Sequence, residues 1–276
     1  MDYGFLLIIL KLTPMPKLVL LLANTLTFLG TLYVNYIYVS GSGSGSGKSV
    51  GEISDQYSTL ITPAGYAFSI WGLIYLGLLV YAVRQVLPQT GESLLIHRLG
   101  WPSAAALLGI GWWIFASAFD WEWATVVLIF GSLFVLLVPL LMNAGAIRTL
   151  GRTDRDRWTV AWPLAALAGW LTVASPVNLL TILTGNGGLP ESPSPTIWAM
   201  LAVIAVAVVA LAVTASLRML AFALPVAWGL LGVFVAEQER GNAPLAYVAL
   251  AAAVAVLVGA IVLTFRLRRG VERPAA

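Results

Sequence analysis

Long runs of apolar residues without a charged side chain dominate this chain of 276 residues. A helix needs about 20 such residues to cross roughly 30 Å of hydrocarbon, so runs of this length are typical of transmembrane helices. The pattern predicts eight spans, over residues 18–39, 66–86, 101–118, 123–146, 158–182, 195–216, 219–236 and 244–266. The expected fold class is an all-α, multi-pass transmembrane helical bundle.

The composition agrees with a membrane protein and excludes disulfide bonds and several kinds of metal site. The chain is 60% apolar and 10% charged, whereas a soluble domain carries about 25% charged residues, so a soluble protein is excluded. It has no cysteine and a single histidine, His97. A disulfide framework, a thiolate metal site and a multi-histidine metal site are therefore excluded, and we expect no metal site.

The basic residues indicate how the chain is oriented in its membrane. An even number of spans with both termini in the cytoplasm places all lysines and arginines there except Lys48 and Arg240. Cytoplasmic segments of membrane proteins are enriched in these residues, so we expect a multi-pass protein of a prokaryotic inner membrane. The net charge of +3 follows from this topology, and no nucleic-acid partner is expected. The basic run Arg148–Arg157 is interpreted as a cytoplasmic anchor, with a lipid-headgroup or regulatory site as the alternative.

The spans divide the chain into two membrane parts. A Gly- and Pro-rich linker separates an aromatic-rich bundle of five helices from a part of three helices rich in Ala, Val and Leu. The predicted segments are a lead-in at 1–17, the five-helix bundle at 18–184, the linker at 185–194, the three-helix C-terminal part at 195–266 and a basic cytoplasmic tail at 267–276.

The longest predicted connection is the outside loop at 40–65. It begins with a Gly/Ser repeat at 41–47, either engineered or natural, which behaves as a flexible coil. The acidic, polar and aromatic residues of Glu52–Tyr57 follow it. Long ordered loops of this kind are often lids, so the segment is expected to be either a lid over the bundle or a solvated tether.

No ionisable side chain is expected near the middle of the membrane, where such groups usually mark ion pathways or proton relays. The carboxylates of Asp120, Glu122, Glu237 and Glu239 fall in predicted outside turns, where they are interpreted as solvated helix ends. No catalytic residue is expected, and a binding or transport role is favoured over an enzyme.

The 11 tryptophans are the most informative excess in the sequence. Tryptophans near helix ends belong to interfacial belts, but some aromatic residues lie deeper. Depth below the membrane surface follows from the helical rise of 1.5 Å per residue, counted from the predicted helix ends. By this count the deeper aromatic residues are Trp71, Tyr75, Trp112, Trp113 and Trp170. They either line a pocket for a flat apolar ligand or pack as core. Replacing Trp228, in the three-helix part, by Phe is expected to change ligand binding little.

The stretch from Pro63 to Tyr75 resembles the second-helix signature of the TspO/MBR family, the tryptophan-rich sensory proteins related to the peripheral benzodiazepine receptor. That signature has a proline eight residues before a tryptophan, here Trp71, and a tyrosine four residues after it. In the fifth helix the family places a tryptophan eight residues before an asparagine, as Trp170 and Asn178 do. The resemblance covers about residues 18–182, and the chain is similar to a long, divergent member with three extra helices.

This resemblance implies a bundle that binds porphyrins or other flat hydrophobic ligands beneath the first long loop, often as a homodimer, in the role of a sensor or carrier. The ligand, a tetrapyrrole for example, would be bound non-covalently. The residues implied to contact it are Trp71, Tyr75, Tyr66, Phe68, Trp113, Trp170 and Asn178. Tyr66 and Phe68 stand one position out of the usual register. The alternatives are a membrane transporter of a small hydrophobic molecule and a structural or assembly subunit of a membrane complex.

Overall fold

The computed structural model describes residues 29, 60–86, 93–190 and 192–269, and the regular elements in these ranges are helical. They are the 3₁₀ turn η1 (Gly65–Ser69), α4 (Ile70–Val86), α5 (Leu94–Ala118), α6 (Glu122–Met142), α7 (Ala144–Thr149), the π turn η3 (Arg157–Ala161), α8 (Trp162–Gly185), α9 (Pro195–Leu217), α10 (Leu220–Glu239) and α11 (Ala243–Arg269). Within these residues, seven helical segments are long and apolar enough to cross a membrane. The all-α, multi-pass fold class is confirmed. The lead-in, nearly all of the predicted first span and most of the 40–65 loop lie outside the described residues.

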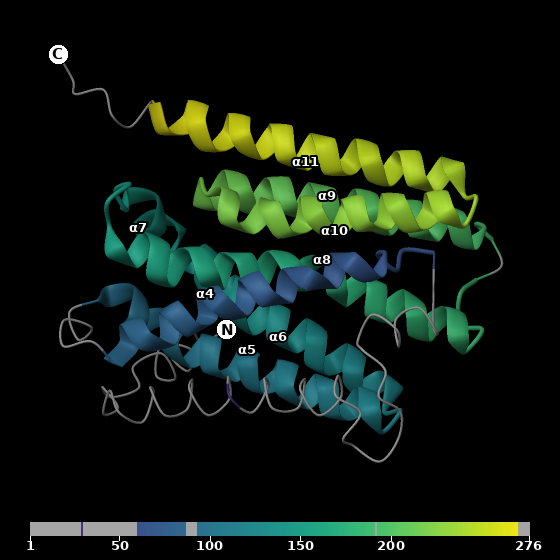
Figure 1. The fold of residues 1–276 in the computed structure, drawn as a ribbon, viewed down its shortest axis with the longest axis horizontal. Helices are drawn as coiled ribbons and strands as arrows, with labels where there is room; N and C mark the ends of the chain where they lie inside the picture. Colours follow the sequence, from purple (N-terminus) through teal and green to yellow (C-terminus); the bar gives the residue numbers. More distant parts are fainter. Residues whose placement is uncertain (1–28, 30–59, 87–92, 191, 270–276) are drawn as a thin grey trace, which may run out of the picture.

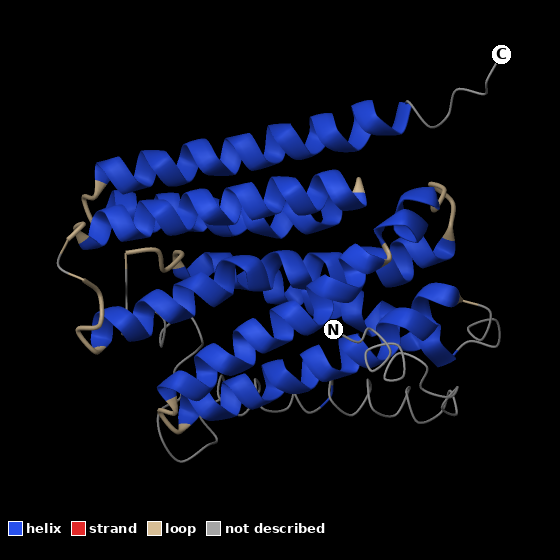
Figure 2. Ribbon diagram, turned by 180° about the vertical axis from the view of Figure 1, so that it is seen from behind, coloured by secondary structure: helices blue, strands red, loops and turns tan. Residues whose placement is uncertain are grey.

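The long helices lie side by side along one common direction (Figures 1 and 2). On one side α11 packs against α9 and α10, and on the other side α5 packs against α6. Between them, α8 contacts α4, α6, α9 and α10, and most of its residues from Pro163 to Val173 are buried. Because α8 touches helices of both predicted membrane parts, it is the main element through which those parts are joined.

Two helix boundaries differ from the sequence prediction for local reasons. The second helix of the described region, α5, begins at Leu94 rather than near 101, because Ser93 caps it by accepting a hydrogen bond from the Ile96 backbone N–H at 3.2 Å. The predicted span 123–146 is interrupted at Asn143, which separates α6 from the short helix α7. The Asn143 side chain donates to the Pro139 carbonyl oxygen at 2.8 Å, which satisfies a carbonyl at the end of α6.

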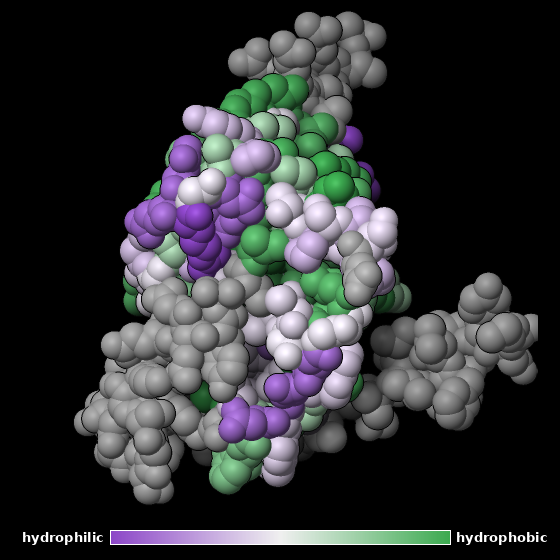
Figure 3. Space-filling view, turned by 90° about the vertical axis from the view of Figure 1, so that its right-hand side faces the viewer, coloured by the Kyte–Doolittle hydropathy of each residue, from purple (hydrophilic) through white to green (hydrophobic). Residues whose placement is uncertain are grey.

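Charged residues are divided unequally between the two ends of the bundle. We call the end where α5, α8 and α10 begin the arginine-rich end, because every arginine that the structure describes except Arg240 lies there. Figure 3 views the opposite end, where α10 ends and α11 begins, and hydrophilic side chains gather on it. Their distribution is the one expected of a bundle whose two ends face water on opposite sides of a membrane.

One carboxylate at this opposite end is not solvated as predicted. The Glu237 side chain is fully buried in the last turn of α10. Its Oε1 accepts from Arg240 Nη1 at 2.6 Å and its Oε2 from Asn242 Nδ2 at 2.9 Å. The interpretation of Glu237 as a solvated helix end is therefore wrong, because both of its oxygens are used to close the turn between α10 and α11.

Candidate functional site

Four of the aromatic residues singled out by the sequence form one cluster around Trp170. We call Phe68, Trp71, Tyr75 and Trp170 the aromatic cluster. The Trp71 ring stacks on Tyr75 with centroids 5.3 Å apart, as expected of residues four positions apart on one face of α4. Trp71 and Phe68 each meet the Trp170 ring edge to face, at 6.2 and 6.0 Å. Such pairs are attractive because the positive edge of one ring faces the negative face of the other.

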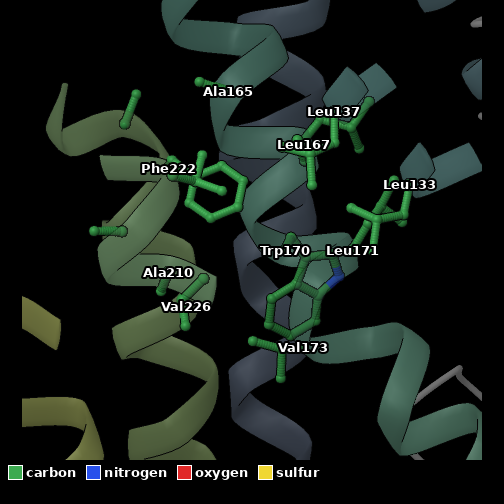
Figure 4. Packing of buried hydrophobic residues seen from close by; sticks show 14 of the residues in the cluster. Leu133, Leu137, Ala165, Leu167, Trp170, Leu171, Val173, Ala210, Phe222 and Val226 are labelled. Carbon is green, nitrogen blue, oxygen red and sulfur yellow. The ribbon is translucent and has the colours of Figure 1, made fainter. Parts of the chain in front are cut away.

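Trp170 is the buried member of the aromatic cluster, with 2% of its surface exposed. Figure 4 shows its indole nitrogen on the side of the ring away from Phe222 and Val226 of α10. Among the described residues this buried N–H has no hydrogen-bond partner. A buried donor without an acceptor costs about 1–3 kcal/mol, so such a group is unusual in a settled core.

Helix α10 contributes a residue that the sequence prediction placed elsewhere. The Trp228 ring meets Tyr66 edge to face with centroids 5.6 Å apart, and its Nε1 donates to the Ala67 carbonyl oxygen at 2.8 Å. Trp228, from the predicted three-helix part, therefore lies against Tyr66, a predicted site residue. Trp228 lies near the middle of α10, so its distance from the helix ends was a signal that it does not belong to an interfacial belt.

Two glycines allow α10 to approach the site this closely. The Ala64 backbone N–H donates to the Gly232 carbonyl oxygen at 3.0 Å. A Cβ on Gly232 would lie 2.7 Å from the Ala67 Cβ, and a Cβ on Gly229 would lie 3.3 Å from the Trp170 ring. The surface of α10 therefore fits against η1 and Trp170 only because both positions lack a side chain.

Trp113 and Asn178, the other two predicted site residues, contact each other and form a separate polar group. The Trp113 Nε1 donates to Asn178 Oδ1 at 2.7 Å, and Asn178 Nδ2 donates to Thr125 Oγ1 at 2.9 Å. These bonds tie α5, α6 and α8 together. Asn178 lies eight residues after Trp170, about 12 Å further along α8. Thr125 was not singled out from the sequence.

The structure thus distributes the predicted residues over three places. The aromatic cluster holds Phe68, Trp71, Tyr75 and Trp170, the polar group holds Trp113 and Asn178, and Tyr66 lies against Trp228. Their roles in ligand binding stay a prediction. Trp112, expected with the deep aromatic residues to line a pocket or pack as core, has 52% of its surface exposed and packs on Phe115 of its own helix.

A small apolar pocket of about 10 Å³ lies beside the aromatic cluster, between α8, α9 and α10. Ile61, Val173 and Leu230 are among its lining residues. A volume of this size holds about one water molecule, whereas ligand pockets usually measure about 300–1,000 Å³. This pocket is therefore not a site for a flat ligand.

Fold and site together define a multi-pass helical membrane protein with an aromatic cluster inside the bundle. The family model described as TSPO-like protein matches residues 20–262, and the chain belongs to this TSPO-like family. The matched range includes α9, α10 and most of α11, whereas the motif resemblance ended near residue 182. No curated protein and no solved structure matched the chain.

Proposed function

We propose that the protein binds a flat hydrophobic ligand of the porphyrin class at the aromatic cluster and acts as a sensor or carrier of that ligand. The observation that carries this proposal is the buried N–H of Trp170, which has no acceptor among the described residues and lies among three further aromatic rings. A planar ligand offers large apolar faces to such rings, and burial of these faces contributes roughly 25 cal/mol per Å². Membership in the TSPO-like family supports the same class of ligand.

The Trp170 N–H implies that the ligand also carries a hydrogen-bond acceptor. A ligand atom with a lone pair, such as a carbonyl oxygen or a ring nitrogen, would give the indole the acceptor that the described residues do not provide. A hydrogen bond of this kind contributes about 1 kcal/mol net, and more where it relieves a buried donor. We therefore infer that the ligand is planar and mostly apolar, with an acceptor at or near its ring system.

The test is a titration of the full chain with protoporphyrin in mild detergent, followed by quenching of tryptophan fluorescence. Trp170→Phe keeps an aromatic ring and removes the N–H, so affinity should fall about tenfold, which corresponds to about 1.4 kcal/mol. Trp112→Phe is the matched control, because Trp112 is exposed on α5 and lies outside the cluster. Equal affinities for the two folded variants would contradict the proposal, as would the absence of any saturable quenching of the unmodified chain.

We also propose the orientation in the membrane, with the arginine-rich end in the cytoplasm of a prokaryotic cell and the end of α10 outside. Support comes from the arginines, of which the structure describes ten at the one end and only Arg240 at the other. Cytoplasmic segments carry this excess of basic residues. The orientation places both termini in the cytoplasm when the span predicted at 18–39 is counted.

A further inference from the structure

We propose that the loop between α7 and α8 is a binding site for the phosphate-bearing headgroup of an anionic phospholipid in the cytoplasmic leaflet. The residues that would contact the lipid are Arg148, Arg152 and Arg155, together with the ring of Trp158. All four side chains are exposed, and the Trp158 side chain is 50% exposed. This proposal concerns a surface far from the aromatic cluster and does not depend on the porphyrin ligand.

The first step of the argument is that the loop is held in one shape. The buried Arg157 donates from Nη1 to the Leu150 carbonyl oxygen at 3.3 Å. Trp158 donates from Nε1 to the Arg152 carbonyl oxygen at 2.7 Å. Both bonds join the π turn η3 to the backbone of the loop. A loop fixed in this way presents its side chains without paying the full entropy cost of ordering them when a ligand binds.

The second step is a count of the charges in the loop. The carboxylate of Asp156 pairs with Arg84 of α4 at 3.3 Å and accepts from Ser93 Oγ at 2.5 Å. The Asp154 carboxylate accepts from the Asp156 backbone N–H at 2.9 Å. Asp156 is thus paired with a cation outside the loop, whereas Asp154 keeps its charge. Three exposed arginines, Arg148, Arg152 and Arg155, stand against this one carboxylate, so the exposed face carries a net positive charge.

The third step identifies the kind of anion from its surroundings. Guanidinium groups match phosphate oxygens with paired hydrogen bonds. The Trp158 ring stacks on Trp162 with centroids 4.9 Å apart, and Met142, at the end of α6, has 64% of its surface exposed. An exposed tryptophan beside arginines and apolar side chains is typical of the level of lipid headgroups. The chemistry fits a phosphate that carries acyl chains better than a phosphate dissolved in water.

The experiment compares phosphatidylglycerol with phosphatidylcholine on the full chain purified in a neutral detergent. Bound lipid is counted by native mass spectrometry over a range of lipid concentrations. We expect phosphatidylglycerol to bind at least tenfold more tightly, since each arginine near a headgroup contributes about a fivefold gain. The preference should shrink in 1 M NaCl, where the screening length falls to about 3 Å.

Two triple variants test whether the preference for phosphatidylglycerol depends on the positive charge of the loop. Replacing Arg148, Arg152 and Arg155 together by Gln should reduce the preference to less than threefold, whereas replacing them by Lys should keep most of it. Arg240→Gln, at the opposite end of the bundle, should leave the preference unchanged. If the Gln triple variant does not fold, Arg148→Gln alone should lower the preference about fivefold.

Three results would overturn the proposal. One is equal binding of the two lipids by the unmodified chain. Another is an undiminished preference in a folded Gln variant. The third is full competition by millimolar inorganic phosphate, which would show that the loop binds free phosphate rather than a lipid.

Discussion

Replacing Gly232 by alanine tests whether α10 supports the candidate site. The added Cβ would lie 2.7 Å from the Ala67 Cβ and 2.9 Å from the Pro63 Cβ. Non-bonded carbon atoms prefer separations of about 3.5–4.0 Å, so α10 and η1 must move apart by about 1 Å. This movement stretches the 3.0 Å hydrogen bond from the Ala64 N–H to the Gly232 carbonyl oxygen.

The expected cost combines three effects on the free energy of unfolding. Overpacking of a well-packed contact destabilises by about 1–3 kcal/mol. Weakening the backbone hydrogen bond removes about 1 kcal/mol more. The higher helix propensity of alanine returns up to about 1 kcal/mol. The net loss is about 2 kcal/mol, which for a chain of this size corresponds to a fall in Tm of about 4–8 °C.

The assay is thermal unfolding of the full chain in mild detergent, followed by far-UV circular dichroism. Gly131→Ala in α6 is the matched control, because a Cβ there meets no atom within 4 Å. Its Tm should stay the same or rise by a few degrees. Equal Tm values for the two variants would refute the reasoning. A lower Tm of Gly232→Ala with unchanged porphyrin affinity would show that α10 supports the fold without shaping the binding site.

Two further predictions concern the polar group and the orientation. Asn178→Leu removes both hydrogen bonds of that side chain and should destabilise by about 1–3 kcal/mol. Adding Trp113→Phe should then cost less than it does alone, and equal costs in the two backgrounds would contradict the coupling. Since the chain has no native cysteine, Ser192→Cys and Thr153→Cys report topology cleanly. An impermeant thiol reagent on intact cells should label only Ser192→Cys, and the reverse pattern would contradict the proposed orientation.

The spans were predictable because the length of an apolar run is a property of the sequence alone. The bounds of α9 and α10 differ from the predicted ranges by at most three residues. The start of α5 was missed because its first turns carry His97 and Arg98, which a search for uncharged runs excludes. The break at Asn143 depends on a side chain that bonds to the turn before it. A side chain that competes with the backbone hydrogen bonds of a helix does not alter the hydrophobicity of the apolar run, so the run alone does not reveal the break.

Part of the candidate site was also accessible from the sequence. The spacing of Trp71 and Tyr75 places both on one helix face, the depth of Trp170 in its predicted span singled it out, and the family resemblance added Phe68. The contact of Tyr66 with Trp228 joins residues more than 160 positions apart. No periodicity within a single helix specifies a contact of this range, because it depends on how α4, α8 and α10 pack together.

The packing of α10 also determines which way the central tryptophan faces. Gly229 lets α10 approach the six-membered ring of Trp170, so that this side of the indole has no room for a ligand. The indole nitrogen lies on the other side of the ring, away from Phe222 and Val226 (Figure 4). Among the described residues this N–H has no acceptor, so the proposed ligand would have to contact it from the side of the ring away from α10. A C-terminal helix thus occupies one side of Trp170, although the motifs of the candidate site lie before residue 182.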